Sequence, residues 1–339
     1  MIFLLLLVIF IFLLLLPFIS SIRELVSPRD SASLRIDMEY CKDPRYFGTS
    51  FRDIVRKAVE PKIKNEGEIS VKLSKDEIVE IAAEKSIPPG ETIDHVLYIK
   101  DRFKSHQHGT FTKEIYVAGN ANVGEENELR ALAADGRITL DRKTKVTRWI
   151  DSEGNIIAGE DCDLGWSASC GGKLTISSGC QFRRLYGLPV ATRERSPKDT
   201  PSFHPKGIEE IGDTALVIGE EWFILPPSTT FDKVVISKQN LLIKKKCVLK
   251  SDVKTYGNLV LEEGVKVAGN IFTEGNIDIK KSSRVFGNVF SQGALHIGDH
   301  VKIGREGMVK SVVSRKDILL CSGVLIFGYV SSGSGGKVQ

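Results

Sequence analysis

The sequence lacks the features that mark several common classes of function. Its 47 basic residues nearly balance its 43 acidic ones, so the formal net charge is only +4 and no basic stripe is present. Nucleic-acid-binding domains normally gather basic residues on one surface, so nucleic acid is not an expected partner. Phosphate-binding loops, dinucleotide fingerprints and Gly-x-Ser-x-Gly elbows are also missing, and no cofactor is predicted.

Cysteine is scarce and scattered. None of the 6 cysteines forms a Cys-x-x-Cys pair, which excludes the usual spacing of zinc sites. The scatter suits free thiols in a reducing compartment better than a disulfide framework. His106 and His108 lie close in sequence but have no neighbouring carboxylate or third ligand, so no metal site is predicted.

Aromatic residues make up only 8% of the chain, whereas glycine occurs 31 times. With short alternations of apolar and polar residues, this composition indicates a turn-rich, mainly β protein. The 339 residues are enough for two or three domains. The patterns described below divide the chain into six segments. These are a transmembrane helix (1–21), a small α/β segment (22–100), irregular β-helix repeats (101–190), a loop-rich insertion (191–238), a regular β-helix (239–330) and a flexible tail (331–339).

One long hydrophobic run is present, at residues 2–19. As a helix it would be about 27 Å long, close to the thickness of a bilayer's hydrocarbon core. It is longer than the apolar core of most signal peptides and no Lys or Arg precedes it, although the Ser-Ser pair that follows would suit cleavage. Arg23, Arg29 and Arg35 lie behind the run. The positive-inside rule therefore predicts a single-pass anchor with the bulk of the chain in the cytoplasm.

Residues 22–100 mix helix and strand signals. A capping residue at Thr49 or Ser50 predicts a helix that ends at Pro61, and "EISVKL" predicts a short strand. A Ser-x-x-Glu capping box beginning at Ser74 predicts a second helix, ended by Pro-Pro-Gly. We expect a small α/β segment that tethers or caps the domain after it.

The C-terminal part of the chain repeats with a period of eighteen residues. Gly257, Gly275 and Gly293 open the same phrase, and Gln239 opens an earlier copy. A fifth copy begins at Lys316 after about five extra residues near "KSVVS". A repeat of this kind indicates stacked structural units rather than a single globular core.

Within each repeat, apolar residues fall in pairs spaced by two, and the pairs recur every six residues. Residues i and i+2 lie on one face of a strand, so three short strands make one turn, or rung, of a three-faced parallel β-helix. The predicted inward pairs are Leu259/Leu261, Val265/Val267, Ile271/Thr273, Ile277/Ile279, Ser283/Val285, Val289/Ser291, Leu295/Ile297, Val301/Ile303 and Gly307/Val309.

A weaker form of the same period occurs earlier in the chain. The segments that begin at Arg137 and Lys173 align two periods apart, and a less regular rung runs from Gly119. The predicted inward residues are Ile138/Leu140, Ile156/Ala158, Cys162/Leu164, Leu174/Ile176 and Cys180/Phe182. Stacking of the two cysteines predicts a ladder of small buried residues rather than a metal site or disulfide. We interpret residues 191–238 as an excursion from one β-helix, with two separate β-helices as the alternative.

Residues 239–330 resemble the bactofilin family of bacterial polymer-forming cytoskeletal proteins. The resemblance rests on Ile-x-Ile and Val-x-Gly phrases and on four Gly-Asn pairs, Gly257-Asn258, Gly269-Asn270, Gly275-Asn276 and Gly287-Asn288. It implies a β-helix that polymerises end to end without nucleotide at the inner (cytoplasmic) membrane and acts there as a scaffold for envelope-associated proteins. The spanning helix, the α/β segment and the second block of rungs depart from the family's plan.

Self-association is expected at the ends of the β-helix, because the last rung exposes unpaired backbone groups. Ile326, Phe327 and Tyr329 lie in that rung, and the resemblance implies that an aromatic residue such as Phe327 helps to hold subunits together. Phe272 and Phe290, eighteen residues apart and directed outward, form a second predicted contact patch.

Two alternatives to a scaffold remain open. "IGDHVKIGREGMV" is similar to the repeats of hexapeptide acyltransferases, in which His296 or His300 would be the catalytic residue. The pattern holds for only two or three steps, so no catalytic residue is assigned. The other alternative is a non-polymeric envelope binding module that uses one side of the β-helix as a platform.

Overall fold

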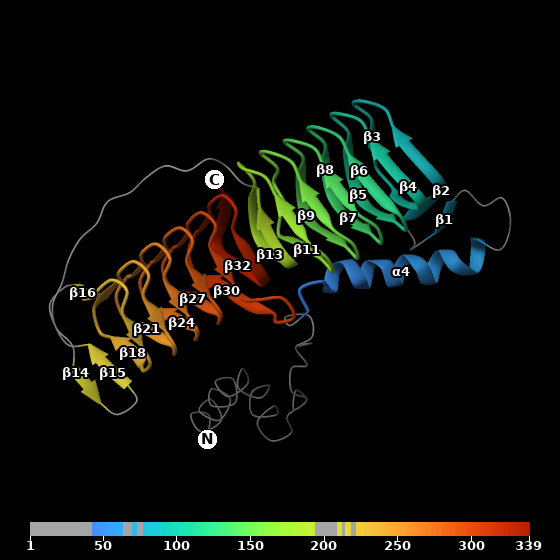
Figure 1. Cartoon of the computed structure of the whole chain (residues 1–339). Coiled ribbons are helices and arrows are strands. Elements are labelled where there is room, and N and C mark those ends of the chain that lie inside the picture. The colour runs from blue at the N-terminus through green and yellow to red at the C-terminus, as the bar shows by residue number, and fades with distance from the viewer. Residues whose placement is uncertain (1–42, 64–69, 73–76, 194–208, 212–213, 218–221) are drawn as a thin grey trace, which may run out of the picture. The chain divides into compact units, whose positions relative to one another are not determined.

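The computed structural model describes residues 43–63, 70–72, 77–193, 209–211, 214–217 and 222–339. From Pro44 onward they form one compact unit, a β-solenoid with a single helix in its described part. Figure 1 shows its rungs as two successive stacks of strands. The mainly β class and the repeat architecture agree with the sequence-based prediction.

The strands of the first stack pair in parallel from rung to rung, apart from β1, which pairs antiparallel with β2. One column joins β2 to β4, β6, β8, β10, β12 and β13, and another continues through β5, β7, β9 and β11. The strands are β1 (Ser70–Lys72), β2 (Ile78–Ile87), β3 (Thr92–Ile93), β4 (Val96–Ser105), β5 (Thr110–Val117), β6 (Asn120–Val123), β7 (Glu128–Ala134), β8 (Ile138–Leu140), β9 (Lys145–Ser152), β10 (Ile156–Ala158), β11 (Ser167–Cys170), β12 (Leu174–Ile176) and β13 (Gln181–Thr192).

The second stack has the more regular repeat. Its strands are β14 (Glu209–Ile211), β15 (Thr214–Val217), β16 (Trp222–Leu225), β17 (Thr230–Phe231), β18 (Val234–Ser237), β19 (Asn240–Ile243), β20 (Val248–Leu249), β21 (Val253–Thr255), β22 (Leu259–Leu261), β23 (Lys266–Val267), β24 (Ile271–Thr273), β25 (Ile277–Ile279), β26 (Arg284–Val285), β27 (Val289–Ser291), β28 (Leu295–Ile297), β29 (Lys302–Ile303), β30 (Lys310–Ser314), β31 (Ile318–Leu320) and β32 (Leu325–Val338). Apart from the antiparallel hairpin of β14 and β15, each strand pairs in parallel with its equivalent in the next rung.

The inward residues of both stacks form one continuous apolar core. All the inward pairs predicted from the sequence are buried except Gly307/Val309. Val309 is 57% exposed, because the extra residues of this rung form a loop between β29 and β30. The rung therefore closes with Val312 and Ser314, which pair with Val289 and Ser291. The predicted insertion exists, but it precedes "KSVVS" and shifts the third inward pair.

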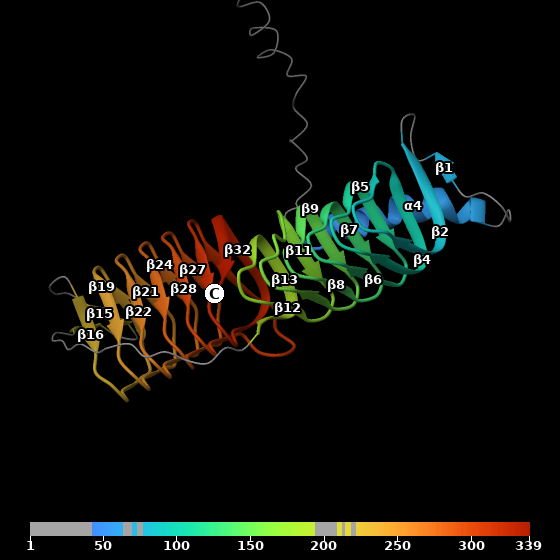
Figure 2. The same cartoon turned by 90° about the horizontal axis from the view of Figure 1, so that it is seen from above.

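The two stacks meet through their last rungs. β13 pairs antiparallel with β32 from Gln181↔Lys337 to Ala191↔Leu325, so the rung that ends the first stack lies along the rung that ends the second. Figure 2 shows β13 and β32 adjacent between the two stacks. The chain is thus neither one continuous coil nor two unconnected ones, because the stacks join end to end by antiparallel pairing.

The predicted flexible tail is part of this junction. Residues 331–338 belong to β32 and pair with both β31 and β13. Ser332 Oγ donates to Lys316 O at 2.7 Å, and Val338 is buried. The prediction of a flexible tail was wrong because its glycine and serine residues were interpreted as a linker. In the structure these small residues let the backbone of β32 approach the neighbouring rung closely. A Cβ on Gly336 would lie 2.1 Å from the ring of Phe182.

The segment before the predicted rungs also differs from expectation. Residues 78–87 form strand β2, which pairs with β4, instead of the predicted second helix. The short strand predicted in "EISVKL" is present as β1. The pairing of solenoid strands thus begins within the segment expected to be α/β.

The first predicted helix is present as α4 (Tyr46–Ile63), which begins before Thr49 and extends past Pro61. It lies along the outer face of β5, β7 and β9 (Figure 2). Val55 and Val59 pack against Ala131 and Ala133 and their neighbours in a second small apolar cluster. The helix therefore covers one side of the first stack rather than its end.

The predicted membrane helix, residues 2–19, lies outside the described residues. Within the described part of the chain, no helix is both long enough and apolar enough to cross a bilayer.

Candidate functional site

The Gly-Asn pairs that carry the family resemblance form ladders at two corners of the second stack. Asn258 N donates to Asn240 Oδ1 at 2.7 Å, and Asn276 N donates to Asn258 Oδ1 at 2.8 Å. The preceding glycines are required because the chain passes close to the rung before: a Cβ on Gly275 would lie 2.5 Å from Gly257 O. The repeated phrase therefore builds the corner of each rung.

The two stacked cysteines also belong to a corner. Cys162 Sγ donates to Asp141 O at 3.1 Å and Cys180 Sγ donates to Gly159 O at 3.0 Å. Both are buried, free thiols. At equivalent corners Thr144 and Ser283 donate in the same way to carbonyls of the preceding rung. These cysteines thus act as small hydrogen-bond donors in a ladder.

The three residues predicted to mediate end-to-end contact lie at the junction inside the chain. Ile326 is fully buried and pairs with Val190 of β13. Tyr329 pairs with Tyr186, and Phe327 lies between these positions on β32. The edge of the last rung therefore already has a partner within the chain.

An open edge lies at the other end of the second stack. β16 pairs with β19 and β17 pairs with β20, and among the described residues neither strand has a partner on its other side. Phe223 and Leu225 are buried in this rung, while the Trp222 side chain is 40% exposed. Unpaired strand edges over an apolar core are the structural basis of strand addition. Sequence reasoning missed this edge because it placed residues 191–238 in a loop-rich insertion.

Phe272 and Phe290 lie as predicted, side by side on the outer face of one column. The two residues pair in register on β24 and β27. Lys254, one rung earlier, places its Nζ 5.7 Å from the ring centre of Phe272 and 4.7 Å from that of Tyr256. The result is an aromatic patch with a cation over it, a favourable but small contact surface.

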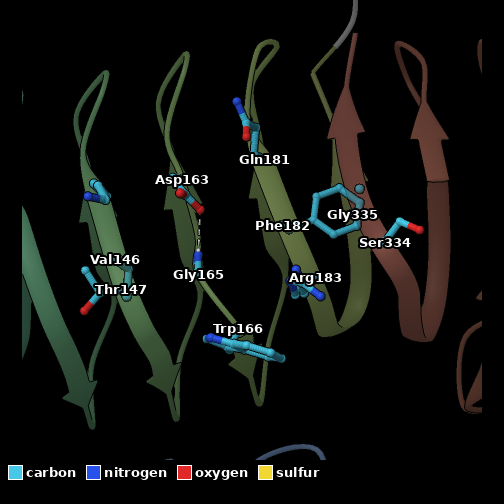
Figure 3. A pocket seen from close by; sticks show the side chains of 12 residues that line it. Val146, Thr147, Asp163, Gly165, Trp166, Gln181, Phe182, Arg183, Ser334 and Gly335 are labelled. Carbon is cyan, nitrogen blue, oxygen red and sulfur yellow. Dashed lines mark hydrogen bonds between the residues drawn. The ribbon is translucent and has the colours of Figure 1, made fainter. Parts of the chain in front are cut away.

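A shallow polar groove crosses the junction of the two stacks. It has a volume of about 360 Å³ and is lined by β9, β13, the turn before β11 and the Ser334–Gly336 segment of β32. Trp166 is 59% exposed, and the Arg183 guanidinium lies 4.7 Å from its ring centre. Figure 3 shows the two side chains close together beneath Gln181 and Asp163. Trp and Arg, together with Tyr, are the residues most enriched at binding hot spots.

The two histidines considered for acyl transfer occupy different environments. His300 sits at a corner in a left-handed backbone conformation, with φ of 55°. His296 points outward from β28, where it contacts Asp278 on the preceding rung and Cys321 on the following one. The described residues include no group of three acidic, His or Cys side chains arranged to hold a metal.

These features define the described part of the chain as a two-stack β-solenoid with a helix along one side, an aromatic patch, a junction groove and an open edge at β16 and β17. Comparison with protein-family models, with curated proteins and with solved structures gave no match.

Proposed function

We propose that this protein is a structural scaffold that self-associates end to end through the open rung of its second stack. The observation that carries the proposal is the edge formed by β16 and β17. The apolar core extends into this rung, and within the described residues each of the two strands is paired on one side only. A second copy can continue the stack there by backbone pairing, as β32 does with β13 inside the chain. The edge is thus suited to assembly.

The proposal includes attachment to the inner membrane and a bactofilin-like role. The charge-free run at residues 2–19 supports the anchor, and the Gly-Asn repeats support the relationship to bactofilins. Assembly would need no nucleotide, and the assembled solenoids would present their sides to envelope-associated proteins. Phe272 and Phe290 offer such a side surface.

The experiment measures assembly of the full chain in detergent, without nucleotide, by light scattering and electron microscopy over a range of protein concentrations. We expect concentration-dependent oligomers or filaments from the unaltered chain. The double variant Trp222→Lys/Thr230→Lys places two cations on the edge rung, where Trp222 is 40% exposed. Charged side chains on an edge strand oppose strand addition, so this variant should remain monomeric.

The control is Val309→Lys, which adds a cation at a residue that is 57% exposed but lies in the loop between β29 and β30. It should assemble like the unaltered chain. A chain that stays monomeric at every concentration would refute the scaffold and favour the binding-module alternative, for which the groove beside Trp166 offers a surface.

A further inference from the structure

Asp278, His296 and Cys321 form a chain of hydrogen-bonding groups on the outer surface of the second stack. Asp278 and His296 pair in register on β25 and β28, and Cys321 follows β31 on the next rung. Nδ1 of His296 lies 2.7 Å from Asp278 Oδ1, and Nε2 lies 3.1 Å from Cys321 Sγ. A nucleophile on one ring nitrogen and a carboxylate on the other is the arrangement that activates cysteine in covalent catalysis.

The charges around the imidazole hold it in this orientation. The hydrogen bond with Asp278, followed by that with Cys321, raises the pKa of His296 to about 9, and burial opposes the shift. Burial also opposes ionisation of Asp278, but hydrogen bonds from His296 and Lys280 lower the pKa of its carboxyl. Lys280 Nζ lies 2.6 Å from the second oxygen, Oδ2. The ring therefore holds a proton firmly once it has one, and it accepts the thiol proton in its neutral form, which predominates above about pH 9.

Cys321 differs from the other described cysteines in its exposure. Cys162, Cys170, Cys180 and Cys247 are buried, whereas Cys321 is partly exposed. Burial raises the pKa of the Cys170 thiol to about 12, which makes it a poor nucleophile. Among the described cysteines, the thiol of Cys321 is thus the accessible one and lies beside a base.

The backbone at Cys321 is fixed by both stacks. Its N–H donates to Ile297 O at 2.8 Å, and its carbonyl accepts a hydrogen bond from Thr192 Oγ1 at 2.6 Å. The side-chain amide of Gln339 reaches the thiol, with Oε1 3.7 Å from Sγ. Asp278 and Cys321 lie on opposite nitrogens of the ring, so the three groups do not converge on a shared metal position.

We propose that Cys321 is a nucleophilic cysteine that accepts an acyl group from an activated acyl donor such as a thioester. His296 is the base and Asp278 is the positioning residue. Sγ attacks the acyl carbonyl, the thiol proton passes to Nε2 of His296, a new S–C bond forms, and the bond to the leaving group breaks. The leaving group departs with the proton from Nε2, so the products are an S-acyl cysteine and the protonated leaving group. This covalent site is independent of end-to-end assembly.

The test treats the full chain with p-nitrophenyl acetate on both sides of the His296 pKa of about 9 and follows nitrophenolate release, intact mass and peptide maps. The rate should rise as the imidazole loses its proton. We expect acetylation of Cys321 ahead of every buried cysteine, and no such adduct in Cys321→Ser. His296→Gln should slow the reaction by roughly 10²-fold, the range of general base catalysis. Asp278→Asn should slow it less and shift its pH profile, an effect that a purely structural residue would not produce.

Cys247→Ser is the matched control, because this thiol is buried in the same stack. It should leave the rate unchanged. Either a persistent acyl adduct or a burst followed by turnover at Cys321 supports the proposal. Acetylation of Cys321 at the rate of a free thiol in the denatured chain, or an unchanged rate in a His296→Gln variant with native circular dichroism, would overturn it.

Discussion

At the scale of single residues, the glycines of the repeat have a steric role that can be measured. Gly275 passes so close to the previous rung that an added Cβ would lie 2.5 Å from Gly257 O. Backbone atoms cannot move away without breaking the pairing of adjacent rungs. Gly275→Ala should therefore lower the free energy of unfolding by about 1–3 kcal/mol, the usual cost of overpacking, as measured by denaturant titration.

Gly335→Ala is the control for this substitution. Gly335 also lies in the second stack, but an added Cβ would meet nothing within 4 Å. Its unfolding free energy should stay within about 0.5 kcal/mol of the unaltered chain, as for most surface substitutions. Equal losses in the two variants would show that glycine flexibility, rather than the close approach of rungs, explains the effect.

At the scale of elements, the period of the sequence predicted the regular rungs but not the exceptions. An eighteen-residue repeat with inward pairs is a local signal, and Leu259 and Leu261 pair with Ile277 and Ile279 as expected. β2 was missed because "EIVEIAAEKSI" is rich in helix-forming Glu, Ala and Lys, and its pairing with β4 overrides that propensity.

The irregular first stack was harder to interpret because its rungs differ in length. Arg137 N reaches Asn120 Oδ1 across 17 residues, whereas Lys173 N reaches Asn155 Oδ1 across 18. A one-residue change of rung length breaks the alignment of the repeat without breaking the stack, since a corner can absorb it. Among the site residues, the stacking of Phe272 and Phe290 follows from the period alone. The partner of His296 does not, because Cys321 lies beyond the insertion at residues 304–309.

The docking of α4 depends on a buried ion pair. Arg52 is 2% exposed and donates to Asp151 Oδ1 at 2.5 Å and to Ala134 O at 2.8 Å. Arg52→Met would leave the buried carboxylate of Asp151 with fewer partners, although Arg45 still contacts it at 2.9 Å. We expect a loss of about 3 kcal/mol in unfolding free energy, near the lower end of the range for breaking a buried pair.

Denaturation can be followed by the fluorescence of Trp149, after Trp166 and Trp222 are replaced by Phe. Trp149 reports on helix docking because its ring centre is 5.6 Å from that of Phe51 on the helix. Arg148→Met is the control, because Arg148 is 53% exposed and pairs with Glu114 at 3.5 Å. Exposed pairs contribute at most about 1 kcal/mol. Similar effects of the two substitutions would contradict a structural role for the buried pair.

At the scale of the whole molecule, the antiparallel junction determines which ends are free. The sequence pattern identifies rungs, but it does not show which rung lies beside which other one across a long connection. β13 and β32 are far apart in the chain, and their pairing buries the edge that would otherwise continue the second stack. The same contact orders "SSGSGGKVQ", whose composition alone indicates a flexible linker.

If this junction joins two stacks that are otherwise separately paired, the chain can be divided between them. We expect residues 1–193 and 209–339, coexpressed as two chains, to copurify in equal amounts, because every rung keeps its own neighbours and only β13 and β32 must find each other. Gly336→Val should abolish copurification, since a Cβ there would lie 2.1 Å from the ring of Phe182. The control Gly335→Val should still copurify, because its Cβ would meet nothing within 4 Å. Folded halves that elute apart without any substitution would show that the connection, rather than the antiparallel rungs, holds the stacks together.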